Sequence, residues 1–236
     1  MSASRRLDYL DAMGIDSWRL RGAAPLTQAA QPPGGDPAVV AGTPDVAGLD
    51  WEALRARVAA CSACSLSTSR TQTVFGVGDP AARWLIIGEA PGAEEDRRGE
   101  PFVGRAGQLL DAMLRSLGLS RQQVFIANVL KCRPPGNRDP RPEEARACAG
   151  FLHRQIALIR PAVILAVGRI SAQNLLGVEE TLGKLRQQVH RFGPAQTPLI
   201  VTYHPAYLLR SPGEKRKAWE DLKLAKRVMD SGSRAT

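Results

Sequence analysis

The chain has 236 residues, of which 44% are hydrophobic and 23% charged, proportions that exclude wholesale disorder and are typical of one large domain with an extension. No apolar run approaches the roughly 18 residues that cross a bilayer. The first residues, MSASRRLDYLDAMG, lack the apolar core of a secretory signal. We therefore predict a cytoplasmic protein without a membrane partner.

The positive charge lies outside the first 50 residues. These hold four Arg and six Asp, a net charge of −2, whereas the whole chain carries +9, so the remainder carries 9 − (−2) = +11. An excess of this size on a compact body indicates a polyanionic partner, with nucleic acid as the first candidate. A basic surface that only confers solubility is the alternative interpretation.

Four segments are predicted from composition. Residues 1–21 form a short helical arm, and residues 22–49, rich in Pro, Gly and Ala, form a disordered linker. Residues 50–230 form the folded domain, which Asp50 begins as a helix cap, and residues 231–236 are a tail. A helix on a flexible tether permits a protein partner for the arm, but the sequence identifies none.

Strands and helices alternate along the predicted domain. The strands are expected at 83–89, 124–132, 162–168 and 198–203, and the helices at 51–61, 105–118, 142–159, 169–177 and 215–229. A capping box of Ser211 and Glu214 is expected to begin the last helix, with Trp219 facing inward. This alternation predicts an α/β fold with a mostly parallel sheet, in which ligands bind at the carboxyl ends of the strands.

The chain has four cysteines: Cys61, Cys64, Cys132 and Cys148. Two form a C-x2-C pair, and a cytosolic chain seldom keeps structural disulfides, so metal or redox chemistry is favoured over unrelated buried thiols. Four thiolates close a tetrahedral zinc site or hold an iron–sulfur cluster. The spacing alone does not choose between these two metals.

Carboxylates follow the first predicted strand. Glu89, Glu94, Glu95 and Asp96 lie within eight residues, in a basic domain and at a position where α/β proteins build sites. They suit activation of water or stabilisation of a cation, and a solvated acidic loop is the alternative. Upstream, Gly76-Val-Gly78 matches a dinucleotide-binding pattern, but it precedes a strand and we reject that interpretation.

Three further residues carry side chains that suit either a structural or a ligand-binding role. Phe102, in a Pro/Gly loop before a helix, suits either a core plug or a stacking platform for a base. Asn128, among apolar residues of the second strand, carries an amide that suits a nucleobase edge as well as a sheet-end hydrogen bond. His204 is the one histidine at a predicted strand end.

Two segments suggest contacts with DNA. Lys131, Arg133, Arg138 and Arg141 are spread along a Pro/Gly/Asn loop that is typical of phosphate contacts and, equally, of a solvated loop. After His204, the adjacent pair Leu208-Leu209 stands between Tyr207 and Arg210 in a predicted loop. Apolar side chains at a loop tip are able to enter a base stack.

Five motifs, in this order, carry a resemblance to a known family: GEAPGAEED, PFVGRAGQLLD, NVLKCRPPGNRDP, AVGRISAQNLLG and VTYHPAYLLR. Together with the four cysteines they resemble the family 4 uracil-DNA glycosylases, the iron–sulfur type. The resemblance covers about residues 50–230, and the first 48 residues lie outside it. It implies a three-layer α/β/α sandwich with a central four-stranded parallel sheet, and a structural [4Fe–4S] cluster bound by Cys61, Cys64, Cys132 and Cys148.

The resemblance also implies roles in a pocket for a flipped uracil. Phe102 would stack on the base, Asn128 would pair with its O4/N3 edge, and His204 would donate toward O2. Backbone around Gly88 and Ala90 would complete the pocket. Contacts with DNA are expected from Arg105, Arg133, Arg138, Tyr207, Leu208, Leu209 and Arg210, with Leu208 or Leu209 filling the vacated base stack.

Two features depart from related patterns. Ala90 stands where better-known members of the superfamily carry an acid, which leaves water activation unassigned, with Glu89 and Glu95 as the candidates. Asp96-Arg97-Arg98-Gly99 contains no histidine, which disfavours covalent trapping of DNA as in a related subgroup.

The expected function is therefore a monomeric uracil-DNA glycosylase in base excision repair, which hydrolyses the N-glycosidic bond of deoxyuridine in DNA. The alternative is a non-catalytic nucleic-acid-binding module held together by an iron–sulfur cluster or zinc. Release of uracil from DNA distinguishes the two.

Overall fold

In the computed structural model, the described residues are 45–232. The predicted arm at 1–21 and most of the predicted linker lie outside them. Val46 is 5% exposed and packs into the core, so the folded part takes in residues just before Asp50. Asp50 caps helix α2 (Trp51–Ala59) as expected, because its Oδ1 accepts from the backbone N–H of Ala53 at 2.9 Å.

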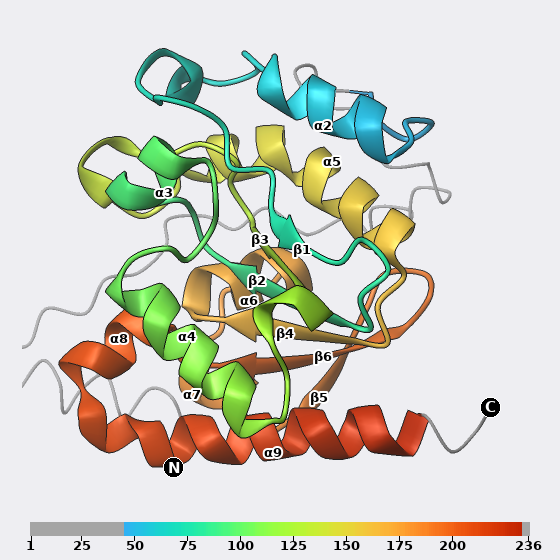
Figure 1. The fold of residues 1–236 in the computed structure, drawn as a ribbon, viewed down its shortest axis with the longest axis vertical. Coiled ribbons are helices and arrows are strands. Elements are labelled where there is room, and N and C mark those ends of the chain that lie inside the picture. The colour runs from blue at the N-terminus through green and yellow to red at the C-terminus, as the bar shows by residue number, and fades with distance from the viewer. Residues whose placement is uncertain (1–44, 233–236) are drawn as a thin grey trace, which may run out of the picture. The chain divides into compact units, whose positions relative to one another are not determined.

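The sheet has six strands in the order β1-β3-β2-β4-β6-β5 (Figure 1). The four central strands are parallel and are those predicted: β3 (Val124–Asn128), β2 (Trp84–Gly88), β4 (Val163–Val167) and β6 (Thr197–Thr202). All side chains of β2, β3 and β4 are buried, as expected for a parallel sheet covered on both faces.

The prediction of four parallel strands in the sheet was incomplete, because an antiparallel strand is added at each edge. These are β1 (Val77–Gly78) and β5 (Val189–Phe192). Neither has an apolar run: β1 spans two residues, and β5 alternates exposed and half-buried side chains. Gly78 has φ 119°, and a Cβ there would lie 1.9 Å from the Val124 carbonyl oxygen, so the Gly-Val-Gly segment serves strand pairing.

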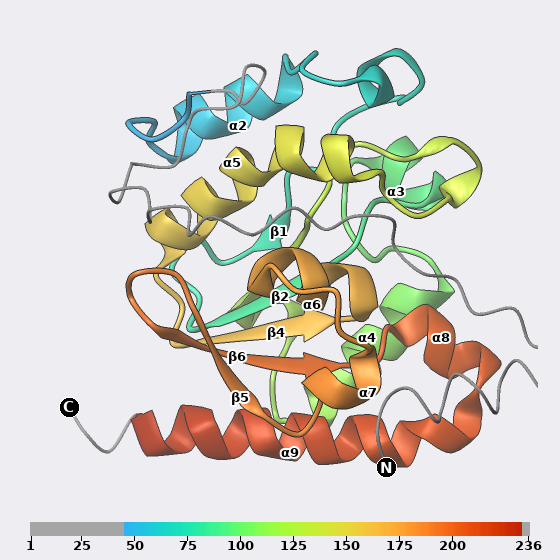
Figure 2. The same cartoon turned by 180° about the vertical axis from the view of Figure 1, so that it is seen from behind.

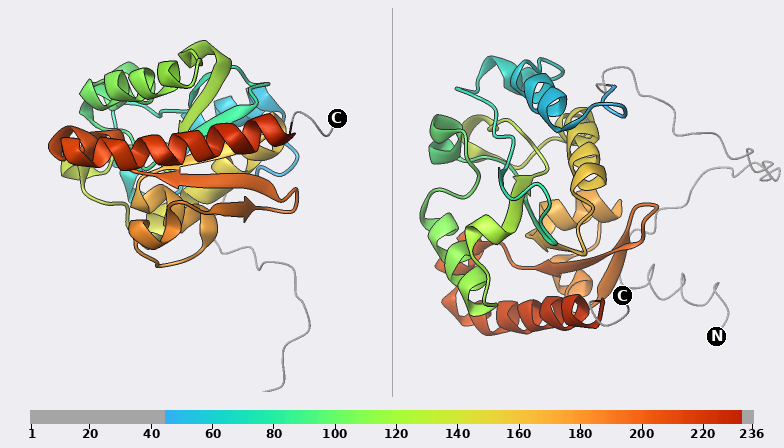
Figure 3. Two further views of the ribbon diagram at one scale, coloured as in Figure 1. Left: turned by 90° about the horizontal axis from the view of Figure 1, so that it is seen from below. Right: turned by 45° about the vertical axis from the view of Figure 1, so that its right-hand side comes forward.

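Helices cover both faces of the sheet, which gives the three predicted layers (Figures 1 and 2). One face packs against α2, α5 (Pro142–Ile159), α6 (Arg169–Leu176) and α7 (Leu182–Leu185). The other packs against α4 (Arg105–Ser116), α8 (Pro205–Arg210) and α9 (Lys215–Gly232). Figure 3 shows α9 running beside α4, where the Lys226 ammonium lies 3.4 Å from the Leu117 carbonyl oxygen. The remaining elements are α3 (Ala93–Arg98) and the short 3₁₀ turns Ser65–Thr68, Arg121–Gln123, Pro135–Asn137 and Pro212–Glu214.

Two predictions for the C-terminal helix were wrong. The Ser211 side chain caps no helix, and the Glu214 carboxylate accepts from the Lys217 ammonium. The expected capping box is therefore absent, although α9 does begin at Lys215. Trp219 is 39% exposed, whereas Ala218, Leu222 and Ala225 are buried. Apolar residues spaced three to four apart indicate a helix with one buried face, but they do not decide which of two adjacent residues, here Ala218 or Trp219, lies on that face.

The expected strand 124–132 ends at Asn128, four residues early. Asn128 is therefore the last residue of β3, and Cys132 lies in the following loop. No helix in the described range 45–232 is both long and apolar enough to cross a membrane. The parallel strands all point the same way, so the segments that follow Gly88, Asn128 and Thr202 meet at one end of the sheet.

Candidate active site

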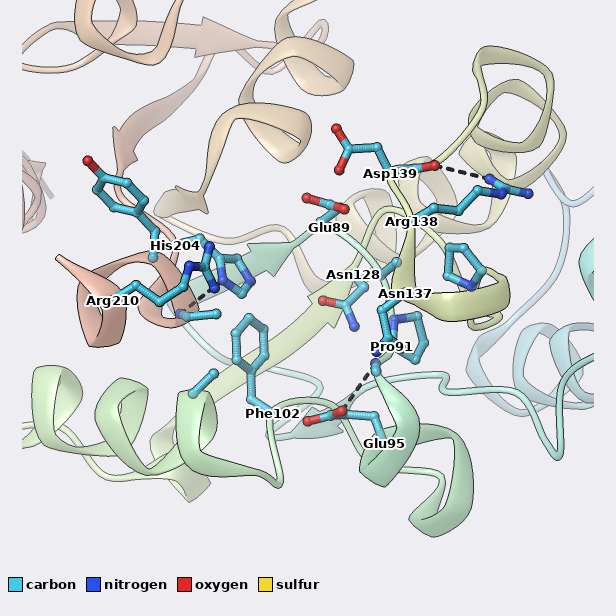
Figure 4. Close-up of a pocket in the computed structure, with 16 residues that line it drawn as sticks. Glu89, Pro91, Glu95, Phe102, Asn128, Asn137, Arg138, Asp139, His204 and Arg210 are labelled. Atoms are coloured by element: carbon cyan, nitrogen blue, oxygen red, sulfur yellow. Dashed lines mark hydrogen bonds between the residues drawn. The ribbon is translucent and has the colours of Figure 1, made fainter.

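A cavity of about 460 Å³ opens at the carboxyl ends of the strands. Figure 4 shows Phe102, Asn128 and His204 directed into it from three different segments. Nine sequence-predicted site residues therefore meet here, since the same cavity is also lined by Glu89, Ala90, Glu95, Arg138, Tyr207 and Arg210. The full lining is Glu89, Ala90, Pro91, Gly92, Glu95, Phe102, Ala106, Asn128, Pro134, Asn137, Arg138, Asp139, His204, Ala206, Tyr207 and Arg210.

The amide of Asn128 lies at the floor of this cavity. The residue is 2% exposed, and its Oδ1 has no hydrogen-bond partner within the described part of the chain. A buried acceptor without a partner is costly, and such a group in a cavity is one that a ligand would satisfy. The site therefore offers a fixed acceptor, with the amide donor beside it, to the edge of a planar polar molecule.

Gly88 makes room for this amide. It pairs with Asn128 in the sheet, and a Cβ on Gly88 would lie 2.4 Å from Asn128 Oδ1 and 2.7 Å from the Phe102 ring. Glycine is therefore required by the close approach of both side chains.

We expect Gly88→Ala to lower the activity that this cavity supports by about 10- to 100-fold, the size of loss that a 1 Å displacement of a positioned group produces. The new methyl group must displace the Asn128 amide or the Phe102 ring. Steady-state kinetics beside Gly48→Ala, where a Cβ meets nothing within 4 Å, tests this. Equal activity of the two variants would contradict it.

Phe102 is held in an unusual conformation. Its φ is 55°, rare for a residue with a side chain, and its ring is 7% exposed. The Arg121 guanidinium donates to its carbonyl oxygen at 3.2 Å and also to that of Pro101. Gly107 allows this turn, since a Cβ there would lie 1.7 Å from the same oxygen. The chain around Phe102 is thus built to place the ring in the cavity.

His204 stacks on Phe102, with ring centroids 5.5 Å apart and planes 29° from parallel. Its Nδ1 accepts from the backbone N–H of Ala206 at 3.1 Å, which caps helix α8. Burial, followed by the charge of Arg210, lowers the pKa of His204 to about 4, against a small opposing effect of Glu95. At neutral pH the ring is therefore uncharged, and with Nδ1 accepting, the proton is on Nε2.

Among the described residues, Glu89 is the carboxylate whose acidity departs most from normal. Burial raises its pKa to about 7, with a further rise from Asp139 and an opposing effect of Arg169. A carboxyl group of this pKa exchanges its proton near neutral pH, which is the property of a general base.

The carboxylate of Glu95 is instead held by hydrogen bonds from the backbone. One carboxylate oxygen accepts from the backbone N–H of Gly92 at 3.1 Å, and the other from those of Val103 and Gly104 at 3.0 and 3.3 Å. It therefore ties the segment after β2 to the loop that carries Phe102. The expected loop around it is partly the helix α3, in which the exposed Glu94 pairs with Arg97.

The segment after His204 is a helix, α8, and not the predicted loop. Leu208 is 1% exposed and packs in the core with α4 and α9, so its prediction as a DNA contact was wrong. Leu209 is half-buried, whereas Tyr207 is 38% exposed and Arg210 is exposed; both line the cavity. The face that the segment presents is therefore Tyr207 and Arg210, because a helical turn directs Leu208 inward.

The basic residues of the predicted phosphate-contacting loop have different surroundings in the structure. Lys131 is 1% exposed, which overturns its prediction as a phosphate contact. Arg138 lines the cavity, but its guanidinium donates to the two carboxylate oxygens of the buried Glu144 at 2.8 and 2.5 Å. This contact lowers the pKa of the Glu144 carboxyl group. Arg133 bonds to Asn137, and Arg105 is exposed at the start of α4, beside the cavity residue Ala106.

Sequence reasoning missed Asp139 and Arg169. Asp139 lines the cavity mouth and pairs with Arg169 at 2.9 Å, and both act on the pKa of Glu89. Arg169 begins α6, two residues after the end of β4, so its position near a strand end was the available signal. Asp139 lies in an irregular loop, where spacing gives no such signal.

The four cysteines come from separate segments. Cys61 and Cys64 follow α2, Cys132 follows β3, and Cys148 lies within α5. All four are free thiols, and the last two are buried. Within residues 45–232, no group of three or more His, Cys, Asp or Glu side chains has a metal-holding geometry.

Two cationic side chains, those of Arg70 and Lys131, lie near these thiols. Arg70 donates to Cys132 Sγ at 3.1 Å and to the Cys61 carbonyl oxygen at 2.6 Å. Burial raises the pKa of Cys148 to about 12, and the charge of Lys131 opposes this rise. Positive groups beside buried cysteines stabilise the thiolate form that ligates metal.

Comparison with known sequences gives the family. Residues 75–223, which carry the whole cavity, match the family model described as the uracil DNA glycosylase superfamily. The chain belongs to this superfamily. Within it, the chain is 45% identical over 173 residues to the type-4 uracil-DNA glycosylase of Archaeoglobus fulgidus, a match that covers 70% of this chain and 86% of the relative.

Other members of the superfamily give the same placement. The type-4 uracil-DNA glycosylase of Thermotoga maritima is 44% identical over 74% of this chain and 92% of its own length. A type-5 uracil-DNA glycosylase of Thermus thermophilus is 36% identical over 56% of this chain and 68% of its own. Higher identity and wider coverage thus place the chain with the type-4 members, which confirms the resemblance drawn from its motifs.

Proposed function

We propose that this member of the superfamily is a uracil-DNA glycosylase. It takes deoxyuridine out of the DNA stack, hydrolyses the N-glycosidic bond and leaves an abasic site, the first step of base excision repair. The observation that carries the proposal is the unpartnered, buried Oδ1 of Asn128 in a cavity walled by the stacked pair Phe102 and His204.

Recognition of the base follows from the donors and acceptors. The uracil ring would stack on Phe102, where Asn128 Oδ1 accepts from N3–H and the amide NH₂ donates to O4. Cytosine presents an acceptor at N3 and a donor at N4, so both contacts become mismatched for a fixed amide. The absence of a side chain at Gly88 leaves the space that the Asn128 amide occupies, and this close packing keeps the amide in place.

Departure of the base is the task of His204. Breaking the glycosidic bond develops positive charge on the sugar and negative charge on uracil, as in glycoside hydrolysis. The neutral ring, with its proton on Nε2, donates a hydrogen bond to uracil O2 as that charge forms. A neutral donor suits this role, because it stabilises the anion without a buried charge before the reaction.

Glu89 is our candidate for the carboxylate that orients water or stabilises the sugar cation. Its pKa is raised to about 7, so it ionises near neutral pH, whereas the Glu95 oxygens are engaged by three backbone N–H groups. Of the two sequence-predicted carboxylates, Glu95 is thus assigned to shaping the pocket.

We expect the single-turnover rate to rise with pH and to level off above about 7, because a raised pKa leaves Glu89 protonated, and inactive, below that value. His204 stays neutral above about 4 and adds no step in this range. Rates measured from pH 5 to 9 should lose this inflection in Glu89→Gln and keep it in Glu94→Gln. An unchanged inflection in Glu89→Gln would exclude the role.

DNA is the expected partner, held by basic and aromatic groups around the cavity. Arg210 and Tyr207 line its mouth, and Arg105 and Arg133 lie on neighbouring segments. Arg138 is already paired with Glu144 and is assigned to supporting the loop. With Leu208 buried, we assign Tyr207 or Leu209 to filling the vacated base stack.

We further propose that Cys61, Cys64, Cys132 and Cys148 hold a [4Fe–4S] cluster, in preference to zinc. The type-4 relatives and the cationic surroundings of the thiols support this. The cluster would join the segment after α2 to the loop after β3 and to α5, which is a structural contribution. Iron analysis and the absorbance of the purified protein test it.

The decisive experiment uses a labelled strand that contains one uracil, with thymine and cytosine strands as controls. Alkali cleaves abasic sites, so cleavage at uracil alone supports the proposal. A folded, iron-containing preparation that binds DNA with a strong salt dependence but releases no base would replace it with the non-catalytic binding module.

A further inference from the structure

Tyr207 presents a partly exposed aromatic ring beside the active-site cavity. The residue lies on α8, lines the cavity and is 38% exposed. Its ring stacks on that of Tyr203, with the two ring centroids 5.2 Å apart and the planes 18° from parallel. Tyr203 directly follows β6 and is half-buried. An exposed ring that a second ring supports is an arrangement that a nucleobase extends by stacking.

A buried arginine holds Tyr203 in turn. The Arg186 guanidinium lies over the Tyr203 ring, 4.4 Å from its centroid, and its Nη1 is 3.4 Å from the Tyr203 hydroxyl oxygen. A cation over an aromatic face is attracted to the ring electrostatically. Arg186 directly follows α7, and Figures 1 and 2 show α7 and α8 beside the first turns of α9. The Arg186–Tyr203–Tyr207 stack therefore joins segments that follow α7, follow β6 and form α8.

Helix α9 fixes the guanidinium of Arg186. The group donates to both carboxylate oxygens of Asp221, at 2.7 and 3.0 Å, and to the Lys217 carbonyl oxygen at 2.6 Å. Asp221 is 0% and Arg186 9% exposed, and a buried ion pair of this kind contributes geometry more than net stability. The adjacent Gln187 has φ 61°, rare for a residue with a side chain, and its Nε2 donates to Asp221 at 2.5 Å. The surroundings thus hold even a strained backbone in one conformation.

We propose that Arg186 and Tyr203 are positioning residues that hold the Tyr207 ring as a platform for the DNA base next to the flipped deoxyuridine. This inference rests on the proposed glycosylase function, and it assigns the contact with the opened base stack to Tyr207 in preference to Leu209. A ring that is already held in place loses less side-chain freedom when DNA binds, so more of the stacking energy contributes to affinity. Removal of either supporting side chain therefore weakens a DNA contact that neither of them makes.

The fluorescence of 2-aminopurine tests the platform. This base analogue loses emission when a ring stacks on it, and it is placed beside an abasic-site analogue in a DNA duplex. We expect wild-type protein to quench the emission, and Tyr207→Leu to leave most of it and to bind about tenfold more weakly, as loss of one base–aromatic stack requires. Trp219→Leu is the matched control, because Trp219 is 39% exposed on α9 and does not line the cavity. Equal quenching by Tyr207→Leu and wild type would overturn the platform.

The positioning role is tested at Tyr203 with two substitutions. Tyr203→Leu keeps an apolar side chain but removes the ring, whereas Tyr203→Phe keeps the ring. We expect Tyr203→Leu to lose part of the quenching and to weaken binding about three- to tenfold, the cost of ordering one side chain on binding. Tyr203→Phe should restore both quantities. Full quenching by Tyr203→Leu, or no rescue by Tyr203→Phe, would overturn the positioning role, since a purely structural residue changes only the melting temperature.

Arg186→Lys decides the question if Tyr203→Leu fails to fold. Lysine keeps the charge beside Asp221 but lacks the planar group that lies over the ring. We expect the same partial loss of quenching, whereas Arg191→Lys should quench fully, because Arg191 lies on β5, bonds to the Gln196 carbonyl oxygen at 3.1 Å and is outside the cavity lining. Full quenching by Arg186→Lys would overturn its role.

The wild-type protein separates this inference from the proposed function. Release of uracil without quenching of the neighbouring 2-aminopurine would overturn the platform and leave the glycosylase activity in place. Quenching without release of uracil would instead count against the proposed function.

Discussion

Replacement of His204 by alanine should lower the single-turnover rate of uracil release by about 10²- to 10³-fold, the loss that follows removal of one donor to a developing anion. The ring is half-buried, neutral and fixed by the Ala206 N–H, so its Nε2 proton is in place before substrate arrives. The effect should fall on the chemical step, with DNA affinity nearly unchanged, because the donor is needed mainly when charge forms on the base.

Single-turnover assays and binding to an abasic-site strand separate these two quantities. His190→Ala is a matched control, since His190 lies on the edge strand β5, contacts the Leu185 carbonyl oxygen at 2.7 Å and does not line the cavity. The alanine at 204 also removes a cap of α8, so circular dichroism must confirm the fold. A rate within threefold of wild type in a folded variant would exclude His204 as the donor.

Asn128→Ala should lower kcat/KM for uracil-containing DNA by about 10- to 100-fold, equivalent to the roughly 1–3 kcal/mol of a bidentate amide–base contact. The substitution removes an acceptor that has no hydrogen-bond partner within the described residues, so the fold should lose little stability. Inhibition by free uracil should weaken by the same factor, because the contact is made to the base itself.

Kinetics with single- and double-stranded substrates, together with uracil inhibition, measure this loss. Asn174→Ala on α6 is the control: its amide donates to the Ile170 carbonyl oxygen at 2.8 Å and lies outside the cavity lining. A fall in activity with unchanged uracil inhibition would show that Asn128 acts elsewhere than on the base.

The course of α8 shows where a local pattern is not enough. Leu208, Leu209 and Tyr207 follow a strand and a proline, and the sequence is compatible with a loop that exposes two leucines. The structure instead forms one helical turn capped by His204, with Leu208 against α4 and α9. Only the presence of those two helices, distant in sequence, makes burial of Leu208 favourable and leaves Tyr207 outside.

Burial of Lys131 was hidden from the sequence for a similar reason. In KCRPPGNRDPR it stands among arginines and looks solvent-exposed, but β3 ends at Asn128 and the chain folds back under α5. Its acceptor Gln155 is 24 residues away, and the Phe75 carbonyl oxygen to which Gln155 bonds is 80 residues from Gln155. Such a network is assembled by tertiary contacts and leaves no periodic pattern.

The sequence by itself determined the four central strands, the long helices α4 and α5, and the residues Phe102, Asn128 and His204 as one site. Buried parallel strands are continuous apolar runs, and their carboxyl ends must meet at one end of the sheet. Only the tertiary structure decided the edge strands, the different surroundings of Glu89 and Glu95, and which ring nitrogen of His204 accepts a hydrogen bond. These depend on burial and on backbone donors from other segments, which alter pKa values and fix side chains through distance in space rather than along the chain.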